Sequence, residues 1–294
     1  MNKEVDKNPE LVGYQVLYRL FNKLGGKFLK VADDIFFLIY RLKFGQRDDD
    51  IYIVTYPKSG TTIMQVVLYQ LTTDGDMNFD HIYDVSPWIR NHSFKKLEPP
   101  QLPSPRIIKS HDGYKTFEKG TKGRFIHVYR NGMDVAVSQY HQVKNYVKPD
   151  LEFDEFLKEF LDVKAKGGWF QFNKRWFENK WKRPVLYVKY EDLLSNKYEQ
   201  IQRVIKFCNL KVDESAIVRA IECSSFEYMK QNENKFGERP PETSKLVYNQ
   251  FIRKGSTGEG NELFKEPQKD LFYKYYNKHV KHYEQKAFSM VEKK

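Results

Sequence analysis

An apolar segment that runs directly into a polar, glycine-containing loop has the clearest chemistry in this sequence. Residues 51–56 are apolar or β-branched, and residues 57–62 read Pro-Lys-Ser-Gly-Thr-Thr. Residues 63–71 are apolar on nearly every side, which predicts a buried helix. The free N–H groups and the dipole of a helix N-terminus attract anions, and Lys58 adds a positive charge. An ordinary capped helix start has a similar composition, so this loop alone leaves both interpretations open.

Cationic residues at the ends of further predicted strands favour the anion site. Three more segments rich in β-branched or aromatic residues predict buried strands, at residues 106–109, 125–129 and 185–189. Lys109 and His111 stand at the end of the first of these strands, and Arg130 follows the second. Tyr190 follows the third. Because ligands of open α/β sheets bind outside the carboxyl ends of the strands, we expect an anion-binding crevice at this edge.

Two other segments offer groups to the same anion. Ser138 lies about two helical turns beyond Arg130, so both side chains can converge on one phosphate. Far downstream, Arg253 and Lys254 precede Gly255, a residue that lets backbone N–H groups approach a ligand closely. We expect Asp134 to support the first turn of its helix through the dipole.

The elements that must position these residues alternate along the chain. Helical patterns are predicted at residues 61–71, 133–144, 153–164, 170–181, 193–208, 214–222 and 268–283. Buried strands that alternate with helices indicate an α/β fold with a central parallel sheet in a single domain. We expect residues 1–45 to form an N-terminal helical segment docked on the core and residues 46–294 to form the main domain. Residues 87–105 and 236–262 are predicted to be loops.

Charge and cysteine content restrict the class of protein only loosely. The 50 lysines and arginines exceed the 39 acidic residues by 11, which permits an anionic ligand, nucleic acid or an anionic surface. Much of this excess is dispersed lysine, and solvated surfaces give the same count. Cys208 and Cys223 both fall in helical patterns without metal-ligand spacing, which favours a reducing compartment and argues against structural zinc.

The N-terminal region suggests neither secretion nor insertion into a membrane. The first residues are charged, and no secretory signal is visible. The apolar stretch at residues 35–40 is too short to cross a bilayer, which requires about 20 apolar residues. We therefore expect a cytoplasmic protein without stable membrane insertion.

Taken together, the motifs resemble the cytosolic sulfotransferase family, which uses 3′-phosphoadenosine 5′-phosphosulfate (PAPS). The matching segments, in chain order, are residues 55–62, 109–111, Arg130 with 134–138, 190–192, 225–230 and 253–258. They extend over most of the chain, from about residue 50 to residue 264. The resemblance implies an α/β domain with a P-loop-like loop that binds the phosphosulfate. It also implies release of 3′,5′-adenosine bisphosphate (PAP) as product.

The resemblance also implies a role for each matching residue. The 5′-phosphosulfate would be bound by Lys58, Ser59, Gly60, Thr61 and Thr62. The 3′-phosphate would be bound by Arg130, Ser138, Arg253, Lys254 and Gly255. The adenosine would lie among Tyr190, Ser224 and Phe226. His111 would be the general base, with Lys109 beside it.

These roles fit an in-line displacement of the sulfuryl group that depends mainly on position and electrostatics. A histidine with an ordinary pKa near about 6.5 can accept a proton at neutral pH, and Lys58 can neutralise the leaving phosphate. No carboxylate cluster has metal-ligand spacing, so we expect no metal. His141, one turn beyond Ser138, is the second candidate base.

The other histidines have structural interpretations. We expect His127, inside a predicted strand, to belong to the core. His81, His92, His279 and His282 lie in polar surroundings and are predicted to be at the surface.

Several positions depart from the family's pattern. Ile63 stands where many members carry Trp, and the sequence Gly-Glu-Gly-Asn at residues 258–261 replaces Gly-Asp-Trp-Lys. Asp112, after the base, replaces Leu. Gln142 stands where members that act on phenols often carry Phe, which suggests a more polar acceptor. The family's usual dimer segment near the C-terminus is missing, so we expect a monomer or a non-standard dimer.

The acceptor is expected to be the hydroxyl or amine of a small molecule. Candidate residues of its pocket are Trp88, Tyr140, Gln142, Tyr146 and Tyr248. Two other classes of protein stay open. A P-loop-type small-molecule kinase would use the same strand, loop and helix, but the GxxxxGK[ST] spacing and a Walker-B acidic residue are missing. A non-catalytic binder of nucleic acid or another polyanion would use the net charge, but the dispersed lysines argue against it.

Overall fold

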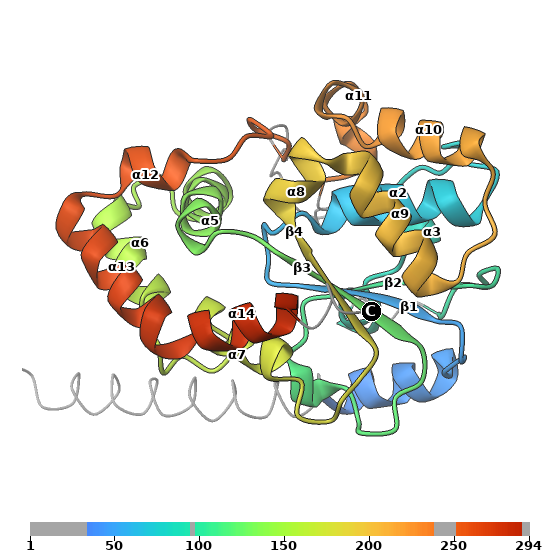
Figure 1. Ribbon diagram of the computed structural model, residues 1–294, viewed down its shortest axis with the longest axis horizontal. Helices are drawn as coiled ribbons and strands as arrows, with labels where there is room; N and C mark the ends of the chain where they lie inside the picture. Colours follow the sequence, from blue (N-terminus) through green and yellow to red (C-terminus); the bar gives the residue numbers. More distant parts are fainter. Residues whose placement is uncertain (1–33, 95–97, 238–250, 290–294) are drawn as a thin grey trace, which may run out of the picture. The chain divides into compact units, whose positions relative to one another are not determined.

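Four parallel strands form the centre of the larger of two compact units in this protein. The computed structural model describes residues 34–94, 98–237 and 251–289. The larger unit covers residues 46–88 and 101–294, and the smaller one covers residues 1–45 and 89–100. The strands are β1 (Ile51–Thr55), β2 (Ile107–Ser110), β3 (Arg124–Tyr129) and β4 (Val185–Lys189), in the order β2-β1-β3-β4 (Figure 1). The predicted α/β fold with a parallel sheet is confirmed, and each strand lies within one residue of its predicted bounds.

The parallel register brings the carboxyl ends of the strands together. Ile53 of β1 is level with Lys109 of β2 and Ile126 of β3. Tyr129 at the end of β3 is level with Lys189 of β4. The residues that follow each strand therefore emerge at one edge of the sheet, as the sequence predicts.

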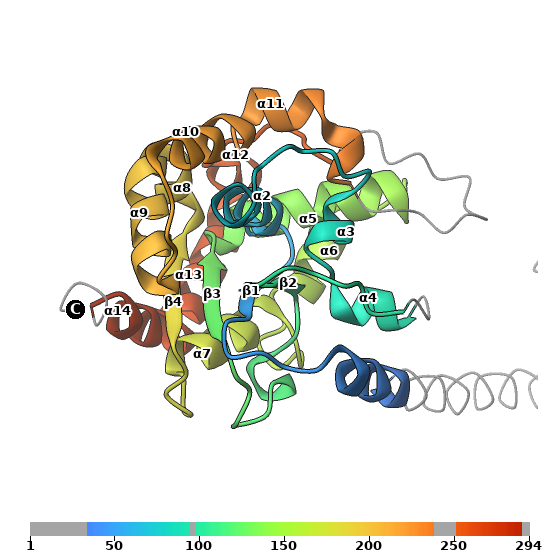
Figure 2. The same cartoon turned by 90° about the vertical axis from the view of Figure 1, so that its right-hand side faces the viewer.

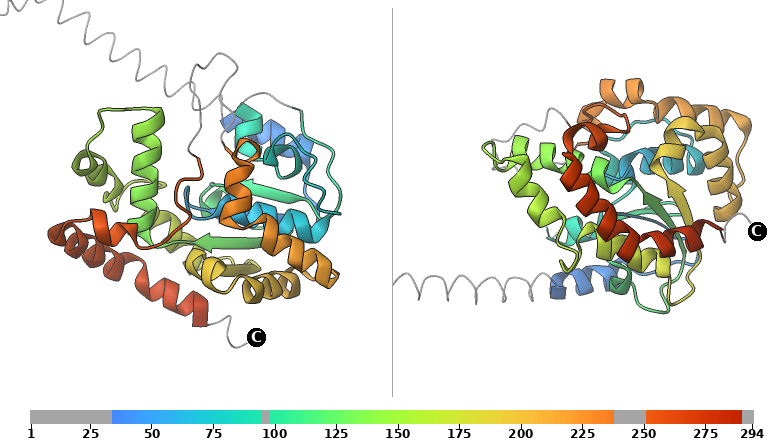
Figure 3. Two further views of the ribbon diagram at one scale, coloured as in Figure 1. Left: turned by 90° about the horizontal axis from the view of Figure 1, so that it is seen from above. Right: turned by 60° about the vertical axis from the view of Figure 1, so that its left-hand side comes forward.

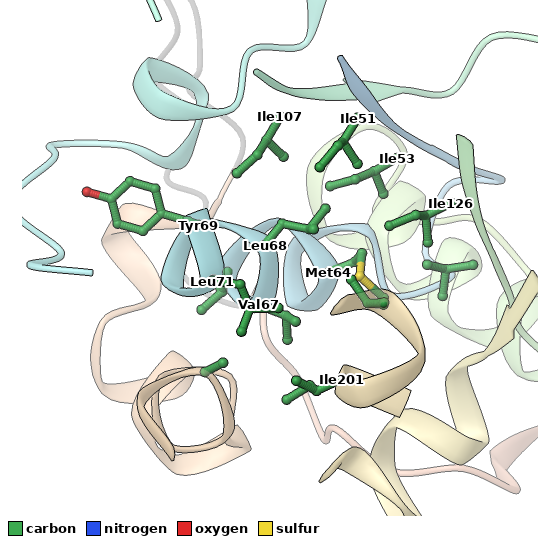
Figure 4. Close-up of a cluster of buried hydrophobic side chains, with 14 of the residues drawn as sticks. Ile51, Ile53, Met64, Val67, Leu68, Tyr69, Leu71, Ile107, Ile126 and Ile201 are labelled. Atoms are coloured by element: carbon green, nitrogen blue, oxygen red, sulfur yellow. The ribbon is translucent and has the colours of Figure 1, made fainter. Parts of the chain in front are cut away.

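One face of the sheet packs against α2 (Thr61–Thr72) and α9 (Lys197–Cys208), and α10 (Glu214–Cys223) packs in turn against α2. Side chains alternate between the faces of a strand, and Ile53 and Ile126 point to this one. They pack against Met64 and Leu68 of α2, with Ile201 of α9 in the same cluster (Figure 4). This cluster fixes α2, so it also fixes the loop at the start of that helix.

The opposite face packs against aromatic helices. His127 of β3 stacks on Trp176 of α7 (Trp169–Glu178), with a ring separation of 5.9 Å. Tyr187 of β4 contacts Phe177 of α7 and Phe288 of α14 (Lys281–Ser289). Figure 2 shows the strands between these two helical layers.

Figure 3 gives two further views that include the remaining helices of the larger unit. They are α3 (Ile82–Val85), η1 (Tyr114–Thr116), α5 (Gly132–Tyr146), α6 (Phe153–Phe160), α8 (Tyr190–Ser195), α11 (Phe226–Gln231), η2 (Glu233–Lys235), α12 (Glu259–Leu263) and α13 (Glu266–His279). α12 packs against α5, which places the segment after residue 251 beside the start of α5.

Four predicted helices were too long, and the one predicted at 170–181 ends at Glu178 because Asn179 takes a left-handed conformation. The helix predicted at 153–164 ends at Phe160, because the Asp162 side chain accepts the Lys164 N–H in a turn. The helix predicted at 193–208 is two helices, α8 and α9, because Asn196 between them leaves the helical conformation.

The helix predicted at 268–283 is interrupted in the same way. Val280 separates α13 from α14, and its side chain is buried where the chain turns back toward the sheet.

The histidine predictions are correct for two residues and wrong for two. His127 is fully buried and its Nδ1 bonds the Val54 carbonyl at 3.0 Å, while His282 is exposed. His81, predicted at the surface, is buried. Its Nδ1 accepts the Tyr83 N–H at 3.1 Å, and its Nε2 donates to the Gly237 carbonyl at 2.5 Å. A helix cap therefore explains the polar surroundings of His81. His279 is partly exposed.

The smaller unit contains a helix at residues 34–44 and α4 (Ile89–Phe94), which lies inside a segment predicted as loop. His92, also predicted at the surface, is buried because its ring packs against Tyr40, with Nδ1 at 3.3 Å from the hydroxyl. Docking of residues 1–45 on the main domain stays a prediction. None of the helices in the described residues is long and apolar enough to cross a membrane.

Shortening a side chain in the cluster under the sheet should destabilise the larger unit strongly. Leu68→Ala removes a completely buried side chain, so we expect the free energy of unfolding to fall by about 2–5 kcal/mol. Leu271→Ala, at a side chain that is 37% exposed, should lower it by less than about 1 kcal/mol. Urea titrations measure both values, and equal effects would contradict the assigned core.

Candidate active site

A pocket of about 180 Å³ lies at the carboxyl edge of the sheet. It is bounded by the loop after β1, the end of β2, the residue after β3, one side of α5 and the segment at residues 251–259. The predicted site residues that line it are Lys58, Gly60, Thr61, Thr62, Lys109, His111, Arg130, Ser138, Gln142, Tyr146, Tyr190, Ser224, Phe226, Arg253, Lys254 and Gly255. Segments almost 200 residues apart in the chain therefore meet around one space.

The loop after β1 presents the start of α2 to this pocket. Lys58 and Gly60 both have positive φ, of 67° and 93°. Gly60 also packs on the Tyr190 ring, where a Cβ would lie only 2.6 Å from a ring carbon. The first turn of α2 carries no acidic residue, so its N–H groups and dipole keep their attraction for anions. Ser59 is buried and lies outside the pocket lining.

His111 is held in one tautomer. Its Nδ1 lies 2.9 Å from the Thr55 carbonyl oxygen and 3.2 Å from the Thr55 hydroxyl. Because a carbonyl only accepts hydrogen bonds, Nδ1 carries the proton and Nε2 carries the free lone pair. Burial and the nearby charge of Lys109 lower the pKa of His111 to about 3, against the effect of the Thr55 bond. The imidazole is therefore neutral near pH 7, but Nε2 is a weaker base than the histidine of ordinary pKa that the sequence analysis expected.

Lys109 is buried beside this histidine and contacts two aromatic rings. Its Nζ donates to the Tyr83 hydroxyl at 2.6 Å and lies 4.5 Å from the centre of that ring. The Trp88 ring lies 4.6 Å from Nζ on another side and meets the His111 ring edge-on at 5.2 Å. Trp88, predicted to belong to the acceptor pocket, lies outside the pocket lining and contacts these two residues instead.

The residues predicted to bind the 3′-phosphate form two groups. Arg130 donates to the carbonyls of Lys58 and Ser256 at 3.2 and 3.0 Å, and its buried Nε has no hydrogen-bond partner. Ser138 faces the same pocket from α5. Arg253 and Lys254 belong to the second group, in which each side chain is already paired with an acid.

That acid is Glu259, which the sequence analysis did not identify. It pairs with Arg253 through both carboxylate oxygens and with Lys254 at 2.7 Å. Burial acts to raise the pKa of Glu259, but the hydrogen bonds from the two cations outweigh it and lower the pKa to about 2. The carboxylate is therefore charged at all ordinary pH values.

Asp134 does more than support its own helix. Its Oδ2 accepts the Gly258 N–H and its Oδ1 accepts the Gly260 N–H, each at 2.8 Å. These bonds tie the start of α12 to the start of α5. Local sequence held no sign of them, because the partners lie 124 and 126 residues away.

Apolar residues surround the side of the pocket predicted to hold the adenosine. Tyr190 and Ser224 are buried there, and Phe226 packs against Gly255, whose positive φ of 63° and contact with the ring leave no room for a Cβ. Ile63, noted in the sequence in place of a tryptophan, also lines the pocket, and the lining residues that sequence reasoning missed here are Leu194, Met229, Phe251 and Ile252. Their only sequence signal was general hydrophobicity.

One side of α5 lines the other end of the pocket. Ser138, His141, Gln142, Asn145 and Tyr146 follow the spacing of a single helix face. His141, the second candidate base, has a lowered pKa because of burial and then the charge of Arg253. Gln142 and Tyr146 thus line the pocket.

The other predicted acceptor residues lie elsewhere. Tyr140 is buried, donates to the Leu151 carbonyl at 3.2 Å and is not part of the lining. Tyr248 lies outside the described residues. Within the described ranges, no group of three His, Cys, Asp or Glu residues could hold a metal ion.

Known proteins resemble this chain both in sequence and in fold. Sulfotransferase 1B1 of Mus musculus is 33% identical over 253 residues, which are 80% of this chain and 84% of the relative. Sulfotransferase 1C2 of Homo sapiens is 31% identical over 252 residues, with the same two coverages.

Solved structures show the same fold at lower identity. Mouse sulfotransferase SULT7A1 complexed with PAP has a TM-score of 0.61 at 24% identity, covering 80% of this chain and 86% of that chain. Retinol dehydratase in complex with androsterone and inactive cofactor PAP has a TM-score of 0.66 at 20% identity, covering 81% and 82%. The family described as the sulfotransferase domain matches residues 48–284. The predicted resemblance is thus confirmed, and the chain belongs to the sulfotransferase domain family.

Proposed function

We propose that this protein is a PAPS-dependent sulfotransferase that acts on the hydroxyl or amine of a small molecule and releases PAP. The observation that carries this proposal is the position of His111, whose Nδ1 bonds the Thr55 carbonyl, in the same pocket as the start of α2. A base and an anion site in one pocket are what transfer of an anionic group to a neutral acceptor requires. The names of the relatives and the PAP in two structures of similar fold support the choice of donor.

The residues of the pocket fit a donor with two anionic groups. The buried Nε of Arg130 has a proton to donate and no partner in the protein, which fits a site for an external anion. Arg130, Ser138, Arg253, Lys254 and Gly255 would hold the 3′-phosphate. The 5′-phosphosulfate would lie at the loop formed by Lys58, Ser59, Gly60, Thr61 and Thr62. PAPS would supply the sulfuryl group to be transferred.

The chain's own residues would act on the acceptor and on the developing charge. His111 would accept the proton of the attacking hydroxyl or amine at Nε2, while the Thr55 carbonyl holds Nδ1. Lys58 and the first turn of α2 would stabilise negative charge on the leaving phosphate. Lys109 would add positive charge next to the base, at a position set by its contacts with two aromatic rings.

The acceptor end of the pocket favours a polar compound. Gln142 and Asn145 place amide groups where an aromatic acceptor would prefer apolar contacts. We infer that the acceptor carries polar groups besides the one that is modified.

The cellular compartment and the oligomeric state of the protein are also proposals. Both cysteines are free, in keeping with a reducing, cytoplasmic location. The monomer or non-standard dimer predicted from the sequence stays a prediction.

Calorimetric titration with PAP and with ADP tests the donor class. We expect PAP to bind without magnesium, and Arg130→Ala to weaken binding at least about tenfold because a charge-assisted contact is lost. Arg175→Ala, on α7 and outside the pocket lining, should bind PAP as the unmodified protein does. Preference for ADP with magnesium would support a kinase instead, and equal binding of both nucleotides would contradict the proposed 3′-phosphate site.

Replacement of the proposed base should separate chemistry from binding. His111→Ala should lower the transfer rate by about 10²–10⁴-fold while PAP affinity changes little, because the base contacts the acceptor and not the nucleotide. His282→Ala, at an exposed histidine, should leave both unchanged. Initial rates with PAPS and calorimetry with PAP give the two readouts. Full activity in His111→Ala would move the assignment to His141.

The pH dependence of the rate should depend on Lys109. Because the pKa of His111 is about 3, its basic form persists at neutral pH, and kcat/KM should fall only as the pH drops toward that value. Lys109→Met removes a positive charge, so the pKa of His111 should rise and the acidic fall should move to higher pH. Burial, the larger cause, remains and limits the shift.

The full pH–rate profile measures this shift. Lys115→Met, at an exposed lysine, is the matched control and should leave the profile in place. An unchanged profile in Lys109→Met would show that the lysine does not act on the base.

A further inference from the structure

Glu259 occupies the cations that the proposed function gives to the 3′-phosphate. Its carboxylate accepts hydrogen bonds from both terminal nitrogens of Arg253 and forms an ion pair with Lys254 at 2.7 Å. The Glu259 side chain is only 10% exposed, and it lines the same pocket as Ser138. A carboxylate in two-point contact with an arginine has the same geometry as a phosphate in that position.

The backbone holds this carboxylate at the pocket. Glu259 is the first residue of α12, and its two neighbours, Gly258 and Gly260, both donate to Asp134. Gly260 also packs so closely on Met133 that no Cβ would fit there. The backbone around Glu259 is therefore fixed to α5, so only rotation of its side chain can move the carboxylate away.

Arg130 differs from this pair in its partners. Its two terminal nitrogens donate to neutral carbonyls, and its Nε is buried without a partner. An incoming phosphate can bind at Arg130 without separating an ion pair. At Arg253 and Lys254 the same phosphate would meet the Glu259 carboxylate, which already accepts hydrogen bonds from Arg253 and pairs with Lys254.

We propose that Glu259 is a specificity-determining residue, whose carboxylate competes with the 3′-phosphate of the nucleotide for Arg253 and Lys254. This inference rests on the proposed function, which places the 3′-phosphate at these cations. Competition acts only on nucleotides that carry a 3′-phosphate, because the 5′ groups lie at the start of α2. Glu259 therefore weakens PAPS and PAP selectively, and it speeds the release of PAP by taking over the cations as the phosphate leaves.

Glu259→Gln tests the competition directly. The amide keeps the length of the side chain and loses its charge, so PAP should bind about tenfold more tightly. ADP, which lacks the 3′-phosphate, should bind with less than about threefold change on the same scale. The PAP dissociation rate, measured by stopped flow, should fall with the dissociation constant. Glu262→Gln, an exposed acid of the same helix without a described ion pair, removes an equal charge and should change neither.

Glu259→Asp is the second variant and keeps the charge. The shorter side chain of aspartate cannot contact both cations as fully. PAP binding should tighten by less than in Glu259→Gln. Circular dichroism spectra that match the unmodified protein show that both variants are folded.

The outcomes separate this inference from the proposed function. If the unmodified protein binds PAP and Glu259→Gln binds it more weakly, the carboxylate orients the cations for the phosphate and the inference is wrong. Unchanged PAP affinity in Glu259→Gln also overturns it. If the unmodified protein fails to prefer PAP over ADP, the proposed function fails first, whatever the variant does.

Discussion

Mutual repulsion among cations is the constraint on which the arrangement of this pocket depends. Five positive side chains surround a space of about 180 Å³: Lys58, Lys109, Arg130, Arg253 and Lys254. Aromatic rings, carbonyls and one carboxylate are the groups that contact them. Lys58 lies 4.6 Å from the Phe251 ring, Lys109 has two rings and a phenol, and Arg130 has two carbonyls. Only Arg253 and Lys254 have a carboxylate among the contacts described. The neutral carbonyls at Arg130 leave the charge of that guanidinium available to an anion.

The sheet and its core fix the positions of the groups around the pocket. The apolar cluster around Leu68 fixes α2, and the packing of Gly60 on Tyr190 fixes the turn before it. Thr55, at the end of β1, holds the proposed base through its carbonyl. The core therefore positions the anion site and the base relative to each other, since both depend on β1.

The strands, most helices and most pocket residues were predictable because they depend on local patterns. Alternating buried strands and helices bring their ends to one edge, and Lys58, Lys109 and Arg130 follow from that rule alone. Contacts between distant segments were not predictable, because nothing near Asp134 indicates that it binds Gly258 and Gly260. His81 and Glu259 show the same limit: their polar sequence surroundings suggest solvent, and tertiary contacts bury them. The acceptor residues were the least predictable, since an aromatic residue such as Trp88 or Tyr140 packs equally well beside a pocket or inside it.

Helix α5 determines how far apart the pocket residues on its surface lie. Ser138, Gln142 and Tyr146 lie on one face at intervals of four residues, which is about 6 Å of helix axis per step. The first faces the proposed nucleotide phosphate, and the other two face the proposed acceptor. Because Asp134 anchors the start of α5, this helix would fix the distance between the proposed nucleotide and the proposed acceptor. Substitutions at Gln142 and Tyr146 could then change the acceptor preference while the anchored start of the helix, and with it the phosphate site, stays the same.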